Sequence, residues 1–204
     1  MTIKGLLLDL HGLLITNFPL KEYEKAVKEF LVKKGYEEGS YKRFKTCWGT
    51  ITSAMEYHSL KEDYLKILDS LPVYSEKDDE LVELLFNAPY ELFLATDSST
   101  ENTTKTLAVA GISSGLFKMI VTGNDVKRGK PETEMYEKIV NAHPYINVKE
   151  WLVIGDRLTD IIPASKLGLK AILCDKDFLK EFLKGGFNAD FKVCGKDSSV
   201  QVSK

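Results

Sequence analysis

Between residues 78 and 174 the sequence alternates between short apolar runs and stretches of helical periodicity, and this alternation constrains the fold more than any other feature. The apolar runs in this part cover 90–95, 119–121, 151–154 and 171–174, and a first apolar run over 3–10 precedes them. The helical stretches cover 78–86, 101–110, 131–142 (with Pro131 as its first residue) and 160–167. We expect a closing helix over 178–183 and an edge strand over 191–193. The pattern predicts an α/β fold with a doubly wound, Rossmann-like parallel sheet.

A helical block interrupts this alternation directly after the first apolar run. Apolar residues recur at three- and four-residue spacing over 20–34, 41–57 and 60–68, and Leu71-Pro72 ends the pattern. We therefore expect an α-helical cap domain over 16–75, inserted into an α/β core domain formed by 1–15 and 76–204.

Charge and cysteine content argue against several classes of partner. The net charge of −2 creates no field that would attract nucleic acid or anionic lipid. The run of three leucines before Asp9 is too short for a membrane span or a signal peptide core. Cys47, Cys174 and Cys194 lack the close spacing of a zinc or redox motif. We expect a cytoplasmic protein with free thiols that binds neither nucleic acid nor membrane.

Polar residues follow the predicted strands, where a doubly wound sheet binds its ligand. They are Asp9, the segment 96–99 (TDSS) and the segment 155–160 (GDRLTD), while Lys130 stands just before the helix expected from Pro131. Two like charges about 4 Å apart repel by roughly 4 kcal/mol at an effective dielectric constant of about 20, so these carboxylates need cations. Lys130 supplies one, and a hard divalent ion such as Mg²⁺ would supply the rest. Asp156 and Asp160, four residues apart, are expected on one face of the first turn of a helix.

Four motifs in this order, LLLDLHG, LATDSS, RGKPETEMYEKI and VIGDRLTDI, resemble those of the haloacid dehalogenase superfamily of aspartate-nucleophile hydrolases, from about residue 3 to 175. The resemblance implies that Asp9 attacks phosphorus and forms an aspartyl-phosphate. It implies that Thr96, Asp97 and Lys130 bind the phosphoryl group. It also implies that Mg²⁺ is held by the carboxylates of Asp9 and Asp156 and the backbone carbonyl of His11, with Asp160 supporting these ligands.

His11 is the main departure from the family pattern. Members usually carry a second aspartate there, which protonates the leaving group and then activates water. Histidine, with an ordinary pKa of roughly 6.5, is chemically able to replace it. Loss of a positioned acid/base costs about 10²- to 10⁴-fold in rate. His11 is thus either a catalytic acid/base or a mark of reduced activity. A second departure is Asp97, where asparagine is common; it either faces the phosphate site or caps the helix near Glu101.

Three functions are compatible with these residues. The first is a Mg²⁺-dependent phosphatase that hydrolyses a small phosphorylated metabolite through Asp9. The second is a metal-free dehalogenase-type hydrolase, which the retention of Asp156 and Asp160 disfavours. The third is a phosphate-binding protein whose turnover is weakened by His11. The sequence leaves the natural substrate, the pathway and the oligomeric state open.

Overall fold

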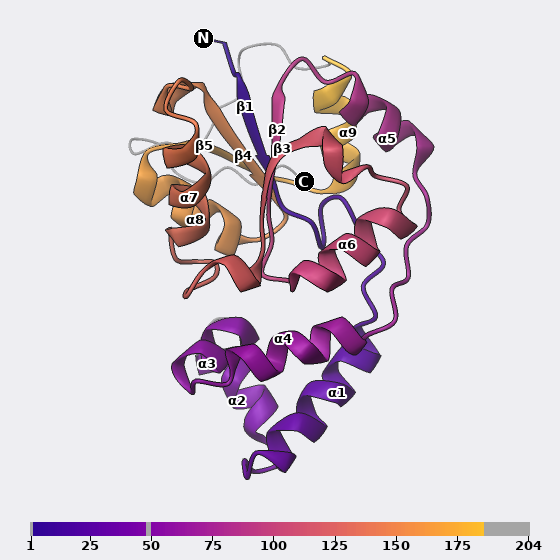
Figure 1. The fold of residues 1–204 in the computed structure, drawn as a ribbon, viewed down its shortest axis with the longest axis vertical. Coiled ribbons are helices and arrows are strands. Elements are labelled where there is room, and N and C mark those ends of the chain that lie inside the picture. The colour runs from indigo at the N-terminus through magenta and orange to yellow at the C-terminus, as the bar shows by residue number, and fades with distance from the viewer. Residues whose placement is uncertain (1, 48–49, 186–204) are drawn as a thin grey trace.

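The computed structural model describes residues 2–47 and 50–185 and has a five-stranded parallel sheet at its centre (Figure 1). The strand order is β3-β2-β1-β4-β5. The strands are β1 (Gly5–Leu8), β2 (Glu91–Ala95), β3 (Phe117–Val121), β4 (Trp151–Gly155) and β5 (Lys170–Leu173). Each neighbouring pair is parallel. The predicted α/β class with a doubly wound sheet is confirmed.

Helices cover both faces of the sheet because successive side chains of each strand point to opposite faces. Leu6 and Leu8 belong to one apolar cluster and Leu7, between them, belongs to the other. The first cluster includes residues of α5 (Asp79–Phe86), α6 (Thr100–Val109) and α9 (Lys176–Leu183), and the second includes residues of α7 (Glu134–Ala142) and α8 (Leu158–Leu167). Burial on both faces explains why these strands read as continuous apolar runs.

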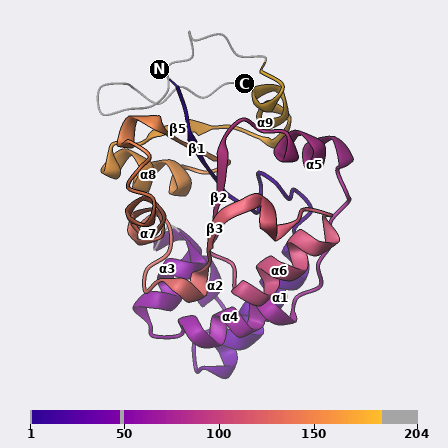
Figure 2. The ribbon, with the colours of Figure 1, turned by 45° about the horizontal axis from the view of Figure 1, so that its top comes forward.

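Four helices between β1 and α5 form a separate layer, which we call the helical unit (residues 20–70). They are α1 (Leu20–Lys33), α2 (Ser40–Cys47), α3 (Ile51–Tyr57) and α4 (Lys61–Ser70). The unit has its own apolar cluster, to which Val27, Phe44, Met55 and Leu65 belong. It lies beyond the carboxyl ends of β1 and β2, with α4 close to α6 (Figures 1 and 2). The domain boundaries proposed above stay predictions.

Two predicted helices differ from the structure. The stretch 41–57 forms two helices rather than one, and the Thr50 side chain starts the second by accepting a hydrogen bond from Ser53 N at 3.0 Å. The helix predicted to start at Pro131 begins at Glu134. Residues 129–132 form a turn instead, in which Glu132 N donates to Gly129 O at 2.9 Å. The predicted edge strand 191–193 and Cys194 lie outside the described residues, and Cys174 is a free thiol.

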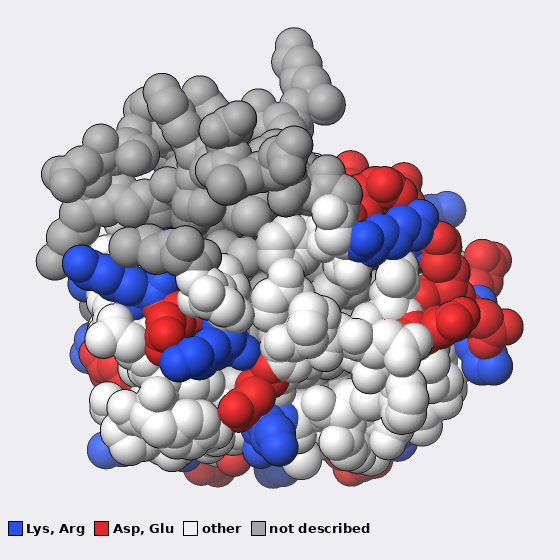
Figure 3. All heavy atoms as spheres, turned by 90° about the horizontal axis from the view of Figure 1, so that it is seen from above, with Lys and Arg blue, Asp and Glu red and all other residues white. Residues whose placement is uncertain are grey.

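Charged side chains of the core pair locally. On the face drawn in Figure 3, described Lys and Arg side chains lie beside Asp and Glu side chains. Between α5 and α9, Lys180 contacts Asp78 and Glu80, both at 2.9 Å, and Lys184 contacts Glu80 at 2.8 Å. These ion pairs fasten the last described helix to the core. Among residues 2–47 and 50–185, no helix combines the length and apolar character needed to cross a membrane.

Candidate active site

Asp9 and Lys130 form the buried centre of the site. Asp9 follows β1 directly, and its backbone N–H donates to Ile154 O of β4 at 3.2 Å. The ammonium group of Lys130 donates to the Asp9 carboxylate, to Asp160 Oδ1 at 2.7 Å and to the Ala95 carbonyl at 3.1 Å. Burial alone would lower the pKa of Lys130, but attraction to Asp160 and Asp9 outweighs it and raises the pKa well above its ordinary value. Lys130 therefore stays a cation.

The structure brings Asp9, Asp156 and Asp160 together. One carboxylate oxygen of each lies within 4.8 Å of the others. Asp160 lies in the first turn of α8, where its second oxygen accepts Arg157 N at 3.1 Å. The prediction that Asp156 shares a helix face with Asp160 is wrong, because α8 begins at Leu158 and Asp156 precedes it. The two carboxylates meet because the end of β4 and the first turn of α8 are adjacent.

Asp156 Oδ1 is buried and, among the described residues, has no hydrogen-bond partner. Its other oxygen lies 3.6 Å from Arg157 Nε. The backbone at Gly12 passes so close to this carboxylate that a Cβ atom there would overlap it, and Gly12 has a φ of 101°, which favours glycine. An unpartnered buried carboxylate oxygen in such a cluster fits a cation, because an orphaned buried acceptor is otherwise costly.

Thr96, Asp97 and Ser98 follow β2 at the same edge of the sheet. Thr96 is buried, and its hydroxyl oxygen accepts Ser98 N at 3.2 Å. Asp97 Oδ1 accepts Lys130 N at 2.9 Å, so its carboxylate faces the site. The alternative that Asp97 caps the following helix is wrong, because Ser99 is the N-cap of α6. Burial, partly offset by Lys130, raises the pKa of Asp97 to about 6.

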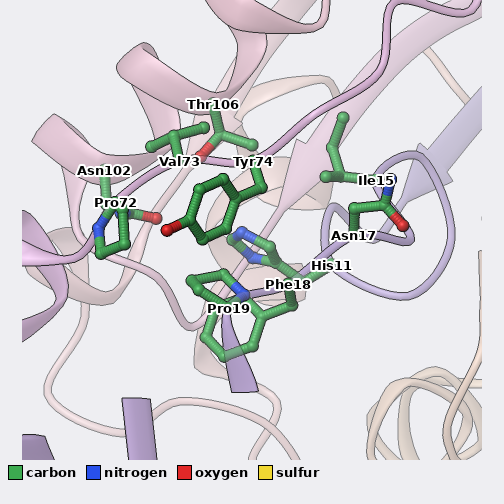
Figure 4. Close-up of a pocket in the computed structure, with 10 residues that line it drawn as sticks. All are labelled: His11, Ile15, Asn17, Phe18, Pro19, Pro72, Val73, Tyr74, Asn102 and Thr106. Atoms are coloured by element: carbon green, nitrogen blue, oxygen red, sulfur yellow. The ribbon is translucent and has the colours of Figure 1, made fainter. Parts of the chain in front are cut away.

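His11 is held by the two segments that connect the helical unit to the core. Its ring packs edge-on against Phe18 with ring centroids 5.1 Å apart. Figure 4 shows the imidazole among Phe18, Pro19 and Tyr74, residues that line a small pocket with it. Burial, together with the positive charges of Lys130 and Arg157, lowers the pKa of His11 to about 4. The imidazole is therefore neutral at pH 7.

A cleft of about 430 Å³ lies between the core and the helical unit, a volume within the range of small-molecule sites. The core side includes Asp9, His11, Thr96, Asp97, Ser98, Lys130 and Asp160, and the helical unit contributes Tyr23, Tyr41, Lys45, Thr52, Tyr64 and Leu68. The hydroxyl groups of Tyr23 and Tyr64 lie 3.0 Å apart. The sequence did not single out Tyr23 and Tyr64 because, at helical spacing, they are indistinguishable from core aromatics.

Comparison with known proteins identifies the family of the chain. The family model of haloacid dehalogenase-like hydrolases matches residues 9–174. No curated protein sequence matches the chain. Among solved structures, YfnB of Bacillus subtilis, a HAD-type hydrolase described as bound to magnesium, has a TM-score of 0.60 at 17% identity and covers 90% of this chain and 100% of its own.

Two further solved structures share the fold. CbbY of Rhodobacter sphaeroides, described in complex with phosphate, has a TM-score of 0.60 at 17% identity over 85% of this chain and 87% of its own. A Thermotoga maritima protein described as a β-phosphoglucomutase has a TM-score of 0.54 at 18% identity over 90% of this chain and 98% of its own. At this identity the likeness establishes the fold, and the family match covers most of the chain. The chain therefore belongs to the haloacid dehalogenase-like hydrolases.

Proposed function

We propose that the protein is a Mg²⁺-dependent phosphatase that hydrolyses a small phosphorylated metabolite, with Asp9 as its nucleophile. The observation that carries the proposal is the cluster at the base of the cleft, where three carboxylates lie together and two of them accept hydrogen bonds from the ammonium group of Lys130. The cluster lies at the carboxyl ends of the parallel strands, where folds of this class bind their ligands.

The donor set fits Mg²⁺, which prefers carboxylate and carbonyl oxygens. The carboxylates of Asp9 and Asp156 and the backbone carbonyl of His11 would hold the ion, and Asp160 would support them. Asp156 Oδ1 has no other partner within the described chain. Three carboxylates face Lys130 and the more exposed Arg157, whose Nε lies 3.6 Å from Asp156, so the cluster is short of positive charge. When bound, Mg²⁺ would help neutralise the phosphoryl oxygens.

The side chains of the site suit a two-step displacement. A carboxylate oxygen of Asp9 attacks phosphorus, the bond from phosphorus to the leaving oxygen breaks, and an aspartyl-phosphate forms. Lys130 balances charge on the phosphoryl oxygens, while Thr96 and the backbone amides that follow it bind those oxygens. Water then attacks the phosphorus of the aspartyl-phosphate, which releases phosphate and regenerates the Asp9 carboxylate.

His11 does not supply the leaving-group proton efficiently in this scheme. Burial and the nearby positive charges lower the pKa of His11 to about 4, so the imidazole is mostly neutral at pH 7. A neutral imidazole can accept a proton from water in the second step but cannot readily donate one in the first. We therefore infer slow turnover of alkyl phosphates, whose leaving groups need a proton, and faster turnover of aryl phosphates.

This property of His11 also supports the third function considered above, a phosphate-ester-binding protein with weak turnover. The two proposals share the same phosphate site and differ only in the rate at which the bound phosphate ester is hydrolysed. Tight binding of phosphate esters without hydrolysis across a broad substrate panel would favour the binding protein. The dehalogenase alternative has less support, since the acidic cluster that includes Asp156 suits a cation.

Hydrolysis of p-nitrophenyl phosphate tests the proposal. We expect hydrolysis that requires Mg²⁺, stops in EDTA and is abolished in Asp9→Asn. Asp63→Asn is the matched control, because Asp63 is an exposed carboxylate of the helical unit that pairs with Lys34 and is not among the residues that line the cleft. If Asp9→Asn were as active as the parent, the nucleophile assignment would be wrong. Chloride release from a 2-chloro acid in EDTA would instead support the dehalogenase.

A further inference from the structure

The loop that carries Lys130 is held by carboxylates at four consecutive backbone N–H groups. Glu134 accepts Lys127 N and Arg128 N, both at 2.8 Å. Glu56 Oε1 accepts Gly129 N at 2.7 Å, and Asp97 Oδ1 accepts Lys130 N at 2.9 Å. Hydrogen bonds to an ionised acceptor are about twice as strong as neutral ones, so these contacts define the path of the loop.

Glu56 differs from the other two acceptors because it belongs to the helical unit. Glu134 is the first residue of α7 and Asp97 follows β2, so both are part of the core. Glu56 lies near the end of α3 and reaches Gly129 across 73 residues of sequence. Its side chain is 11% exposed. The contact therefore exists only when the helical unit lies against this loop.

Lys61, the first residue of α4, makes the complementary contact. Its ammonium group donates to Val126 O at 2.6 Å and to Lys127 O at 3.2 Å, and it lies 3.4 Å from Glu56 Oε1. The helical unit thus offers one acceptor and one donor that match an N–H and two carbonyl groups of the loop. Lys61 also balances the buried charge of Glu56, as buried carboxylates require.

Gly129 allows these carboxylates to approach the backbone. A Cβ atom at this position would overlap the Asp97 carboxylate and would lie 3.3 Å from Glu56 Oε1. The carboxylates of Asp97 and Glu56 therefore enclose the loop at Gly129, next to Lys130. A shift of the Glu56 side chain would move the backbone directly beside Lys130.

We propose that Glu56 is a positioning residue for Lys130, which it holds in place through Gly129 N–H when the helical unit covers the cleft. This proposal rests on the proposed function, in which Lys130 balances the charge of the transferring phosphoryl group. Closure of the helical unit then has two effects: it encloses the substrate, and it completes the set of acceptors that fixes the lysine loop. Misplacing a catalytic group by about 1 Å can cost about 10²-fold in rate.

A second set of contacts between the helical unit and the core provides a control. Ser99 Oγ donates to Asp69, Lys105 Nζ donates to Asp69 O at 3.1 Å, and Asn102 Nδ2 donates to Leu68 O at 2.8 Å. These contacts join α4 to α6 and do not touch residues 126–130. Removing the Asp69 carboxylate therefore weakens the contact between the helical unit and the core away from the loop that carries Lys130.

The test compares Glu56→Ala, Glu56→Gln and Asp69→Ala with the parent. We would measure kcat and KM for p-nitrophenyl phosphate with Mg²⁺, and amide hydrogen exchange of the segment 126–131. For Glu56→Ala we expect a fall in kcat of about 10- to 100-fold and faster exchange of this segment. Glu56→Gln keeps a neutral acceptor and should lie between Glu56→Ala and the parent. Asp69→Ala should raise KM more than it lowers kcat and leave exchange of 126–131 unchanged.

Unchanged exchange of 126–131 in Glu56→Ala would overturn the proposal, as would a fall in kcat in Asp69→Ala equal to that in Glu56→Ala. Melting temperature identifies a folding defect, and if Glu56→Ala fails to fold, Glu56→Gln decides by the same two measurements. A parent protein without Mg²⁺-dependent hydrolysis would refute the proposed function. The exchange comparison would then still decide whether Glu56 holds the loop.

Discussion

Replacing His11 by aspartate should increase the hydrolysis of alkyl phosphates. The imidazole of His11, with a pKa lowered to about 4, rarely carries a proton to donate at pH 7. A carboxyl group in the same cleft behaves differently, since burial raises the pKa of Asp97 to about 6. A carboxyl group at position 11 would also be partly buried and could hold and release a proton near neutral pH, as efficient acid/base catalysis requires.

The expected gain in kcat follows from the rate enhancement that a general acid/base provides. A positioned general acid/base is worth about 10²- to 10⁴-fold in rate, which corresponds to about 2.7–5.4 kcal/mol of barrier. We expect the lower end, about 10²-fold in kcat, because the linker residues around position 11 are packed to fit a ring. Loss of the edge-on contact with Phe18 costs about 0.5–1.5 kcal/mol of stability, a small part of the 5–15 kcal/mol of a typical domain.

Paired substrates and a matched variant make the assay specific. The kcat of His11→Asp is compared with that of the parent for an alkyl phosphate and for p-nitrophenyl phosphate, whose leaving group needs no proton. The gain should appear with the alkyl phosphate and be much smaller with the aryl one. His11→Asn, which has the size of aspartate but cannot transfer a proton, should give no gain. A large loss of activity in His11→Asp would refute the reasoning and make His11 an effective acid/base.

Two other substitutions test the site and the core. Gly12→Ala places a Cβ on the Asp156 carboxylate, and the Mg²⁺ concentration for half-maximal activity should rise about 10- to 100-fold. Gly35, whose φ of 86° is also positive, has open space around it, so Gly35→Ala should leave this concentration unchanged. An equal shift in both variants would contradict the metal assignment. Asp78→Ala removes a helix N-cap and the contact with Lys180, and urea unfolding at pH 7 should show a loss of about 1–2 kcal/mol. Burial alone would raise the pKa of Asp78, but hydrogen bonds from Lys180 and a backbone N–H outweigh it and hold the pKa below its usual value of about 3.9. The carboxylate therefore stabilises the fold above that value, and its contribution is lost as the pH falls through the lower folded-state pKa; a difference from the parent that was unchanged well below pH 4 would contradict this assignment.

Local periodicity was sufficient to predict the sheet and most helices. The short runs that became β1 and β4 are apolar on both faces, as is typical of a buried parallel strand. Where the prediction was wrong, a contact outside the local pattern intervened. The helix expected from Pro131 begins at Glu134, because the preceding residues form the loop from which Lys130 reaches Asp9 and Asp160. Periodicity carries no information about such a loop.

The sequence by itself determined the α/β class and the placement of Asp9, Thr96 and Asp156 at the strand ends, since both depend on neighbours a few residues apart. Tertiary structure alone decided the environments of these groups. Whether His11 is neutral, and which way Asp97 faces, depends on segments that the chain brings together from far apart. The contact between Glu56 and Gly129 joins residues 73 positions apart, and it arises because the helical unit packs against the end of the sheet.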